Sequence, residues 1–261
     1  MATEPKGGGR DPQYLLDLLW RRQRPGTRGP RGSLTLDQIV GAAIEIADAE
    51  GVDGVSMRKV AQKVGVTTMS LYRYVPGKDD LLDLMFEVGT GRPDTTGWPE
   101  DWYGRLLAYG KGVRRLMIAR PWMVDIPISG PPMGPNNIAW MEVLLDSLAG
   151  TRMSEETKLG VLMVVSGFVL SEVRQEVSIM RAAPRTGVGY AEWGRAYQRM
   201  LEFVVDDPAY PAVARLVRSG VFADDRTTAE EDFLYNLRFV LDGIAALLER
   251  RARTAAEDGA V

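Results

Sequence analysis

The sequence contains neither cysteine nor histidine among its 261 residues. Without cysteine there is no disulfide, no thiolate nucleophile and no zinc site built from Cys and His ligands. Without histidine, catalytic triads of the Ser-His-Asp and Cys-His types and histidine pH switches are excluded. Any metal ion would have to be held by oxygen ligands alone. We therefore expect a protein that works by binding rather than an enzyme, with no catalytic residues, no metal and no cofactor.

Long apolar runs are also absent. The longest, Val161 to Leu170, is interrupted by Ser166 and Gly167, whereas a membrane-spanning helix needs about 20 apolar residues. The first six residues and the three glycines that follow them lack the basic and apolar regions of a secretory signal. We therefore expect a cytoplasmic protein with no membrane partner.

An excess of charge of one sign is missing as well, since 32 Lys and Arg residues face 35 Asp and Glu residues. A net charge of -3 argues against non-specific coating of nucleic acid, but it leaves room for a local basic face. Residues 21–32 contain five arginines, no acid and five Gly or Pro residues. Residues 1–33 are therefore predicted to be a flexible basic N-terminal arm, in which residues 12–20 could form a short amphipathic helix. The arm is either a solvated linker or a DNA contact made by Arg22, Arg24 and Arg28.

From Thr35 onward, apolar residues recur at three- and four-residue steps, as they do on one face of a helix. A capping box at Thr35 begins this helix, and Gly51 provides its stop signal. Two short helices follow, one capped by Ser56 and the next by Thr67, with a tight turn at Gly65 between them. This order of elements predicts a helix-turn-helix.

The predicted helix-turn-helix is basic. Residues 55–78 contain no acid, whereas the neighbouring helices are rich in acids. Taken alone, the bases would also fit an ordinary solvated surface. Their coincidence with a predicted DNA-reading unit favours a DNA-binding face. The bases are Arg58, Lys59, Lys63, Arg73 and Lys78.

Residues 34–86 resemble the DNA-binding domain of the tetracycline-repressor (TetR) family of bacterial transcription regulators. The resemblance rests on the AAxxxADxxG run of the first helix, on SMRKVA, on the Gly-Val turn, and on LYRYV followed by GKDDLL. The family usually has histidine where this chain has Tyr74, whose hydroxyl can still donate a hydrogen bond to a phosphate. The resemblance implies an all-α protein, with a three-helix helix-turn-helix domain at 34–80 and a helical effector-binding and dimerisation domain at 81–255.

The resemblance also implies roles for single residues. Thr67 would cap the recognition helix, and Arg58 would contact a base edge or a phosphate. Since one helix-turn-helix buries little surface, specific binding implies a two-fold dimer on a near-palindromic double-stranded DNA operator. The resemblance assigns major-groove contacts to Thr68, Met69, Ser70 and Arg73, and phosphate contacts to Tyr72, Tyr74 and Lys78.

The C-terminal half has no alternating strand pattern and no Gly-rich phosphate loop, and its periodicity predicts helices throughout. The helix expected at 154–181 has no polar face around residues 161–170, and the helix expected at 228–253 carries a near-heptad apolar pattern. One interpretation is that packing within a single chain buries the apolar faces of both helices. We favour a homodimer in which these two helices and their symmetry mates form a four-helix arrangement, as the resemblance also implies. The other helices are expected at 102–119, 136–148 and 190–205, with a short piece at 121–126 and a Pro-flanked stretch at 208–219.

Aromatic and methionine side chains in this half are typical of a cavity for a large, flat, mostly apolar molecule. The alternative for each residue is ordinary core packing. The tetracycline repressor holds a magnesium–drug chelate with histidines, which this chain lacks, so we expect an organic effector that needs no histidine-bound metal. The candidate effector-binding residues are Phe86, Trp102, Tyr109, Met117, Trp122, Met123, Trp140, Met141, Met163 and Phe168.

These patterns predict a ligand-responsive, DNA-binding transcription regulator, a repressor that a small-molecule effector releases from its operator. Two alternatives remain: a helical enzyme acting on a small molecule, and a protein-interaction adaptor that does not read DNA. No nucleophile–base motif supports the enzyme. DNA binding that weakens steeply with salt would separate the regulator from both alternatives.

Overall fold

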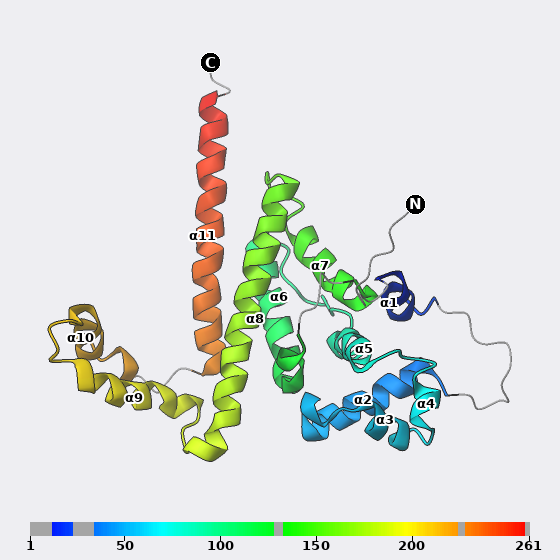
Figure 1. The fold of residues 1–261 in the computed structure, drawn as a ribbon. Helices are drawn as coiled ribbons and strands as arrows, with labels where there is room; N and C mark the ends of the chain where they lie inside the picture. The colour runs from blue at the N-terminus through cyan, green and yellow to red at the C-terminus, as the bar shows by residue number, and fades with distance from the viewer. Residues whose placement is uncertain (1–11, 23–33, 128–132, 224–227, 259–261) are drawn as a thin grey trace, which may run out of the picture. The chain divides into compact units, whose positions relative to one another are not determined.

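A computed structural model describes residues 12–22, 34–127, 133–223 and 228–258. All regular elements in these ranges are helices, so the predicted all-α class is confirmed (Figure 1). The chain divides into two compact units. The first contains Met1–Thr96 and Ala119–Val143, and the second contains Gly97–Ile118 and Leu144–Val261. Within the described ranges, no helix is both long and apolar enough to span a membrane.

The first unit combines the predicted helix-turn-helix with a later segment of the chain. The capping box of α2 is present, since the Gln38 amide donates to Thr35 Oγ1 while the Gln38 side chain accepts from the Thr35 amide. Gly51 ends α2 with a φ of 75°, a conformation that favours glycine. The elements are α1 (Pro12–Leu19), α2 (Leu36–Glu50), η1 (Val52–Gly54), α3 (Met57–Lys63), α4 (Thr68–Leu71), α5 (Lys78–Thr90), η2 (Pro121–Asp125) and the larger part of α7 (Pro135–Ser147).

Helix α1 is packed into the first unit against α5, and Leu18 is fully buried. Beyond its end, Trp20 Nε1 donates a hydrogen bond to the Met133 carbonyl over 2.8 Å. Arg21 donates to the Leu18 carbonyl and pairs with Asp37 at 2.8 Å. Of the predicted arm 1–33, residues 12–22 are thus held against the first unit, while residues 1–11 and 23–33 lie outside the described residues.

The second unit is built around three long helices. Prediction and structure agree on α6, but α8 continues through Pro184, beyond the expected end at residue 181, and ends where Gly187 takes a left-handed conformation with φ 68°. The helix expected at 190–205 divides into two, and the Pro-flanked stretch contains a helix that begins at Pro211. The elements are α6 (Trp102–Ala119), α8 (Glu155–Thr186), α9 (Tyr190–Leu201), η3 (Glu202–Val204), α10 (Pro211–Arg218), η4 (Val221–Ala223) and α11 (Ala229–Asp258).

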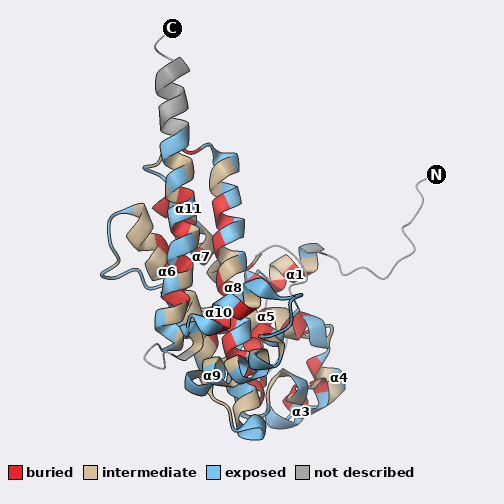
Figure 2. Ribbon diagram, turned by 90° about the vertical axis from the view of Figure 1, so that its left-hand side faces the viewer, coloured by how far each residue is buried: buried red, intermediate tan, exposed pale blue. Residues whose placement is uncertain are grey.

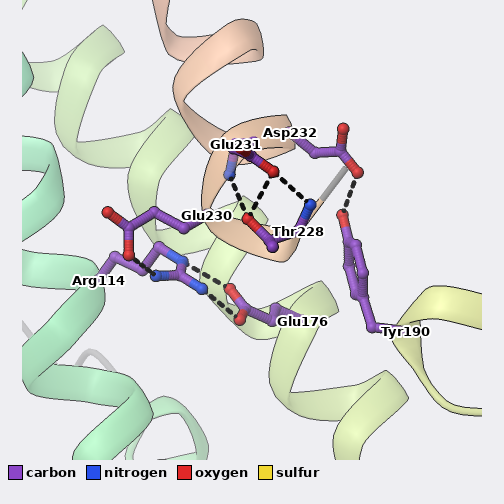
Figure 3. A network of polar contacts seen from close by, with 7 residues as sticks. All are labelled: Arg114, Glu176, Tyr190, Thr228, Glu230, Glu231 and Asp232. Atoms are coloured by element: carbon purple, nitrogen blue, oxygen red, sulfur yellow. Dashed lines mark hydrogen bonds and ion pairs between the residues drawn. The ribbon is translucent and has the colours of Figure 1, made fainter. Parts of the chain in front are cut away.

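Helices α6, α8 and α11 are tied together by a mostly buried arginine. Arg114 of α6 makes a two-pronged ion pair with Glu176 of α8, with hydrogen bonds of 2.8 and 2.6 Å (Figure 3). The same guanidinium reaches Glu230 of α11 at 3.2 Å. Nearby, Tyr190 of α9 donates to Asp232 of α11, and burial together with this bond raises the pKa of the Tyr190 phenol. These contacts fix the order of the helices inside this unit.

Candidate functional site

The turn between α3 and α4 has the geometry that the sequence predicts. Gly65 adopts a φ of 73°, which favours glycine because a side chain would be strained there. The Val66 amide donates to the Ala61 carbonyl at 2.9 Å, and the Gly65 amide donates to Gln62 at 3.2 Å. These bonds satisfy carbonyls at the end of α3 and redirect the chain into α4.

Helix α4 is short and is held by a cap at one end and a buried anchor at the other. Thr67 Oγ1 accepts the Ser70 amide at 3.2 Å, as predicted for the cap. The helix ends at Leu71 rather than near Tyr74, and a turn follows it. After Leu71, the amides of Arg73 and Tyr74 donate to carbonyls only three residues back, those of Ser70 and Leu71, so the backbone tightens into a turn ahead of Pro76. Leu71 and Val75 are both fully buried, so the intervening turn stays fixed against the domain.

The opposite side of α4 faces solvent. Met69 is 77% exposed, an unusual position for a large apolar side chain in a domain this well packed. Figure 2 shows exposed positions along α3 and α4 next to buried ones. Of the predicted DNA contacts, Arg58, Thr67, Met69, Tyr72, Arg73 and Lys78 are exposed, whereas Thr68, Ser70 and Tyr74 are half-buried.

Two of the five bases in this region are neutralised by acids of α2. Lys59 pairs with Glu50, and Lys63 pairs with Glu45 at 2.9 Å. These acids precede their partners by 9 and 18 positions, so no helical spacing revealed the pairs in the sequence.

The other three bases are uncompensated. Arg58, Arg73 and Lys78 pair with no carboxylate among the described residues, and the one hydrogen bond that the Arg73 side chain makes there is a 3.4 Å donation to Ser70 Oγ. They come from the start of α3, the turn after α4 and the start of α5. Positive charge that is free to meet phosphate therefore comes from the same short stretch of chain as the exposed face of α4.

The predicted arm contacts are only partly described. Arg22 is exposed, and its guanidinium carbon lies 5.3 Å from the centre of the Trp20 ring. Arg24 and Arg28 lie outside the described residues.

Five of the ten candidate effector residues belong to the first unit. Trp122 and Met123 pack against α5 at Gly89, where an added Cβ would lie 3.1 Å from the Trp122 ring. Trp140 is buried and donates its indole N–H to the Gly91 carbonyl at 3.0 Å. Phe86 and Met141 are half-buried. Trp122, Met123 and Trp140 thus lie at the C-terminal end of α5.

The other five candidates belong to the second unit. Tyr109 is buried and shares a hydrogen bond with Ser166, and burial raises the pKa of its phenol. Met117 is buried, Trp102 and Phe168 are half-buried, and Met163 is 66% exposed on α8. The ten residues thus divide between the two units, and their role as one effector cavity remains a prediction.

Glu87 is a structural residue that the sequence reading missed. Its side chain, only 3% exposed, lies on α5 and accepts hydrogen bonds from the backbone amides of Asn136 and Asn137 in the first turn of α7. The Asn137 side chain donates to the same carboxylate at 2.6 Å. Glu87 thereby satisfies amides that a helix start leaves unpaired. In the sequence, Glu87 is an acid between the apolar residues Phe86 and Val88, but nothing indicated its partners about 50 positions later.

Helices α8 and α11 each leave an apolar face uncovered in the single chain. Exposed side chains on α11 include Tyr235 and Phe239, whose rings pack edge to face with centroids 4.9 Å apart. Figure 2 shows exposed positions interleaved with buried ones on both helices. The exposed apolar residues of α8 are Leu159, Met163, Val164 and Met180.

Comparison with known families accounts for most of the chain. Residues 39–85 match the model for bacterial regulatory proteins of the tetR family. Residues 96–248 match the model for the tetracyclin repressor-like C-terminal domain. The two matches follow one another in the order that the sequence resemblance implies.

Individual relatives agree with the family models. The HTH-type transcriptional repressor DrrR1 of Streptomyces coeruleorubidus is 37% identical over 255 residues, which cover 96% of this chain and 91% of the relative. Crystal structures of ActR from Streptomyces coelicolor have the same fold. The apo form gives a TM-score of 0.67 at 25% identity, covering 86% of this chain and all of that chain. The complex with actinorhodin gives 0.66 at 25% identity, covering 83% of this chain and 98% of that one. The chain therefore belongs to the TetR family of bacterial transcription regulators.

Proposed function

We propose that this protein is a homodimeric repressor that reads a near-palindromic operator with α3 and α4 and leaves it when a largely apolar organic effector binds. The observation that carries the proposal is the exposed face of α4 combined with the three uncompensated bases Arg58, Arg73 and Lys78. The family and the repressor DrrR1 support it.

The chemistry of the exposed side chains suits a major groove. Arg73 carries a planar fork of donors that fits guanine O6 and N7, and Met69 offers an apolar tip for a thymine methyl group. Lys78 and Arg58 provide charge for phosphates on either side, while Tyr72 and Tyr74 supply hydroxyl donors. Thr67 acts indirectly, because its cap positions the first turn of α4.

The uncovered apolar faces of α8 and α11 support the dimer. Large apolar side chains in contiguous exposed positions mark interaction surfaces in soluble proteins. A two-fold axis through such a surface would pair each helix with the same helix of a second copy. The dimer would present two reading heads to the two halves of the operator.

An organic effector is supported by the ten aromatic and methionine candidates and by the ActR complex with actinorhodin. The chain contains no histidine to hold a metal–ligand chelate. We therefore propose that aromatic stacking and apolar contact, rather than metal coordination, hold the effector.

Selection of bound sequences from random duplex DNA tests the proposed function. The wild type should enrich an inverted repeat, and its affinity should fall by about 10³ or more between 50 and 200 mM salt if several phosphates are contacted. The Arg58→Ala, Arg73→Ala, Lys78→Ala triple variant should enrich no repeat. Lys63→Ala is the matched control, because Glu45 already neutralises that ammonium group. A wild type that enriches no sequence would show that the chain does not read DNA.

A further inference from the structure

Methionine is the sulfur-containing residue of this chain, since cysteine is absent. Its thioether can be oxidised reversibly to a sulfoxide, and a side chain in contact with solvent is the one that an oxidant reaches. The chain has 12 methionines, and many of those described are buried or half-buried. The exposed ones among the described residues are Met69, Met163, Met180 and Met200.

Met69 is the most exposed of these four side chains, at 77%. Local structure holds it in this position. The Thr67 cap fixes the first turn of α4, and the fully buried Leu71 fixes its last residue. Since two positions along an α-helix differ by more than half a turn, burial of Leu71 points Met69 away from the domain. The exposure of Met69 therefore follows from the way α4 is anchored.

The place of Met69 in the fold separates it from the other exposed methionines. Met163 and Met180 are on α8, and Met200 is on α9, so all three belong to the second unit. Met69 belongs to α4, the helix proposed to enter the major groove. Oxidation of Met69 thus alters a side chain of the reading face, whereas oxidation of the other three leaves that face unchanged.

We propose that Met69 is an oxidation site through which peroxide weakens binding to the operator. Hydrogen peroxide transfers one oxygen atom to the Met69 sulfur: the O–O bond breaks, an S–O bond forms, the sulfur is oxidised to the sulfoxide and the peroxide is reduced to water. Methionine sulfoxide reductases reverse the change. This inference rests on the proposed function, since it assumes that α4 lies in a major groove.

The sulfoxide does not suit the contact proposed for Met69. The thioether presents apolar surface to a thymine methyl group, whereas the sulfoxide presents a strong acceptor oxygen that a methyl group cannot satisfy. A buried acceptor left without a donor lowers affinity by about tenfold or more. Because a dimer carries Met69 at both half-sites, oxidation of both copies should weaken binding by about 100-fold.

The test measures affinity for the operator selected with the wild type, by fluorescence anisotropy, before and after treatment with hydrogen peroxide. Peptide mass spectrometry measures the sulfoxide fraction at each methionine in the same samples. The wild type should lose affinity by about 100-fold as Met69 sulfoxide accumulates, and methionine sulfoxide reductases should restore the affinity. Bound operator should slow the oxidation of Met69 and leave the rate at Met200 unchanged.

Each variant is compared with itself before and after peroxide. Met69→Leu has no sulfur at this position, so treatment should leave its affinity as it was. Met200→Leu is the matched control, because it removes the sulfur of a side chain that is 72% exposed in the second unit, and it should lose affinity as the wild type does.

Equal losses in Met69→Leu and the wild type would overturn the inference, as would a wild type that keeps its affinity with Met69 fully oxidised. Oxidation of Met69 at the same rate with and without operator would also overturn it. If Met69→Leu binds no operator before treatment, the wild type decides, and a loss that follows the sulfoxide at Met163, Met180 or Met200 instead of Met69 counts against the inference. An untreated wild type that enriches no sequence fails the proposed function instead.

Discussion

The carboxylate of Glu87 provides a test of how α7 is attached to α5. In Glu87→Gln the side chain keeps its size and one acceptor oxygen, but it loses its charge and turns an amide N–H₂ toward donors that need an acceptor. Those donors are the backbone amides of Asn136 and Asn137 and the Asn137 side chain.

The expected loss of stability follows from these contacts. A hydrogen bond to a charged group contributes about 1.5–3 kcal/mol, and a negative charge at a helix start adds about 0.3–1 kcal/mol. Since glutamine retains part of the bonding, the free energy of unfolding should fall by about 2–4 kcal/mol. At about 2–4 °C for each kcal/mol, the unfolding midpoint should fall by about 4–16 °C.

Thermal and urea unfolding, followed by circular dichroism at one fixed protein concentration, measures this change, because dimer stability depends on concentration. Glu142→Gln is the control, since it makes the same substitution at an exposed position of α7. A loss below about 0.5 kcal/mol in Glu87→Gln, the range of ordinary surface substitutions, would refute the assignment of Glu87 as the anchor of α7.

Three further predictions concern separate parts of the molecule. Lys78→Ala should weaken binding to all DNA sequences and reduce the slope of log affinity against log salt by about 0.9, measured by fluorescence anisotropy; an unchanged slope contradicts the phosphate contact. Arg114→Met should lower the free energy of unfolding by about 3–5 kcal/mol, because Glu176 would be left buried without its cation; urea unfolding checks this, and a neutral result would mean that Glu176 is solvated. Phe239→Glu should give a monomer in sedimentation velocity, since it places a charge on the exposed apolar face of α11; a persistent dimer argues against that face as the interface.

The local signals in the sequence were reliable because they act over a few residues. The capping box at Thr35, the cap at Thr67 and the positive φ of Gly65 all depend on neighbours within about four positions. The end of α4 was placed too late, because its helical pattern continues to Tyr74 while the backbone already turns ahead of Pro76.

The sequence shows where the basic residues of the helix-turn-helix are, but not which of them are paired with acids. In the sequence, all five bases between Val55 and Lys78 are equivalent. The structure separates them, because the packing of α2 on α3 brings Glu45 and Glu50 to two of the lysines. Ion pairs between different helices follow from tertiary contacts and leave no spacing rule in the sequence.

The hydrogen-bond partners of the aromatic residues also depend on tertiary structure. Trp122 and Trp140 are predicted effector contacts because of their residue type, and that role stays a prediction. Their indole N–H groups donate to Asp48 and to the Gly91 carbonyl, and both rings are buried against the first unit. A buried indole needs a partner for its N–H, but the identity of that partner depends on which helices meet.

The sequence by itself determined the absence of cysteine and histidine chemistry, the helical class, the caps and turn of the helix-turn-helix, and the resemblance to the TetR family, because composition and short-range pattern carry all of these. The tertiary structure alone decided three things: which bases stay free for phosphate, how Glu87 holds α7, and how Asp48 holds Trp122. The physical reason is that burial, ion pairing and hydrogen bonding between helices depend on three-dimensional proximity, which the separation of residues along the chain does not encode.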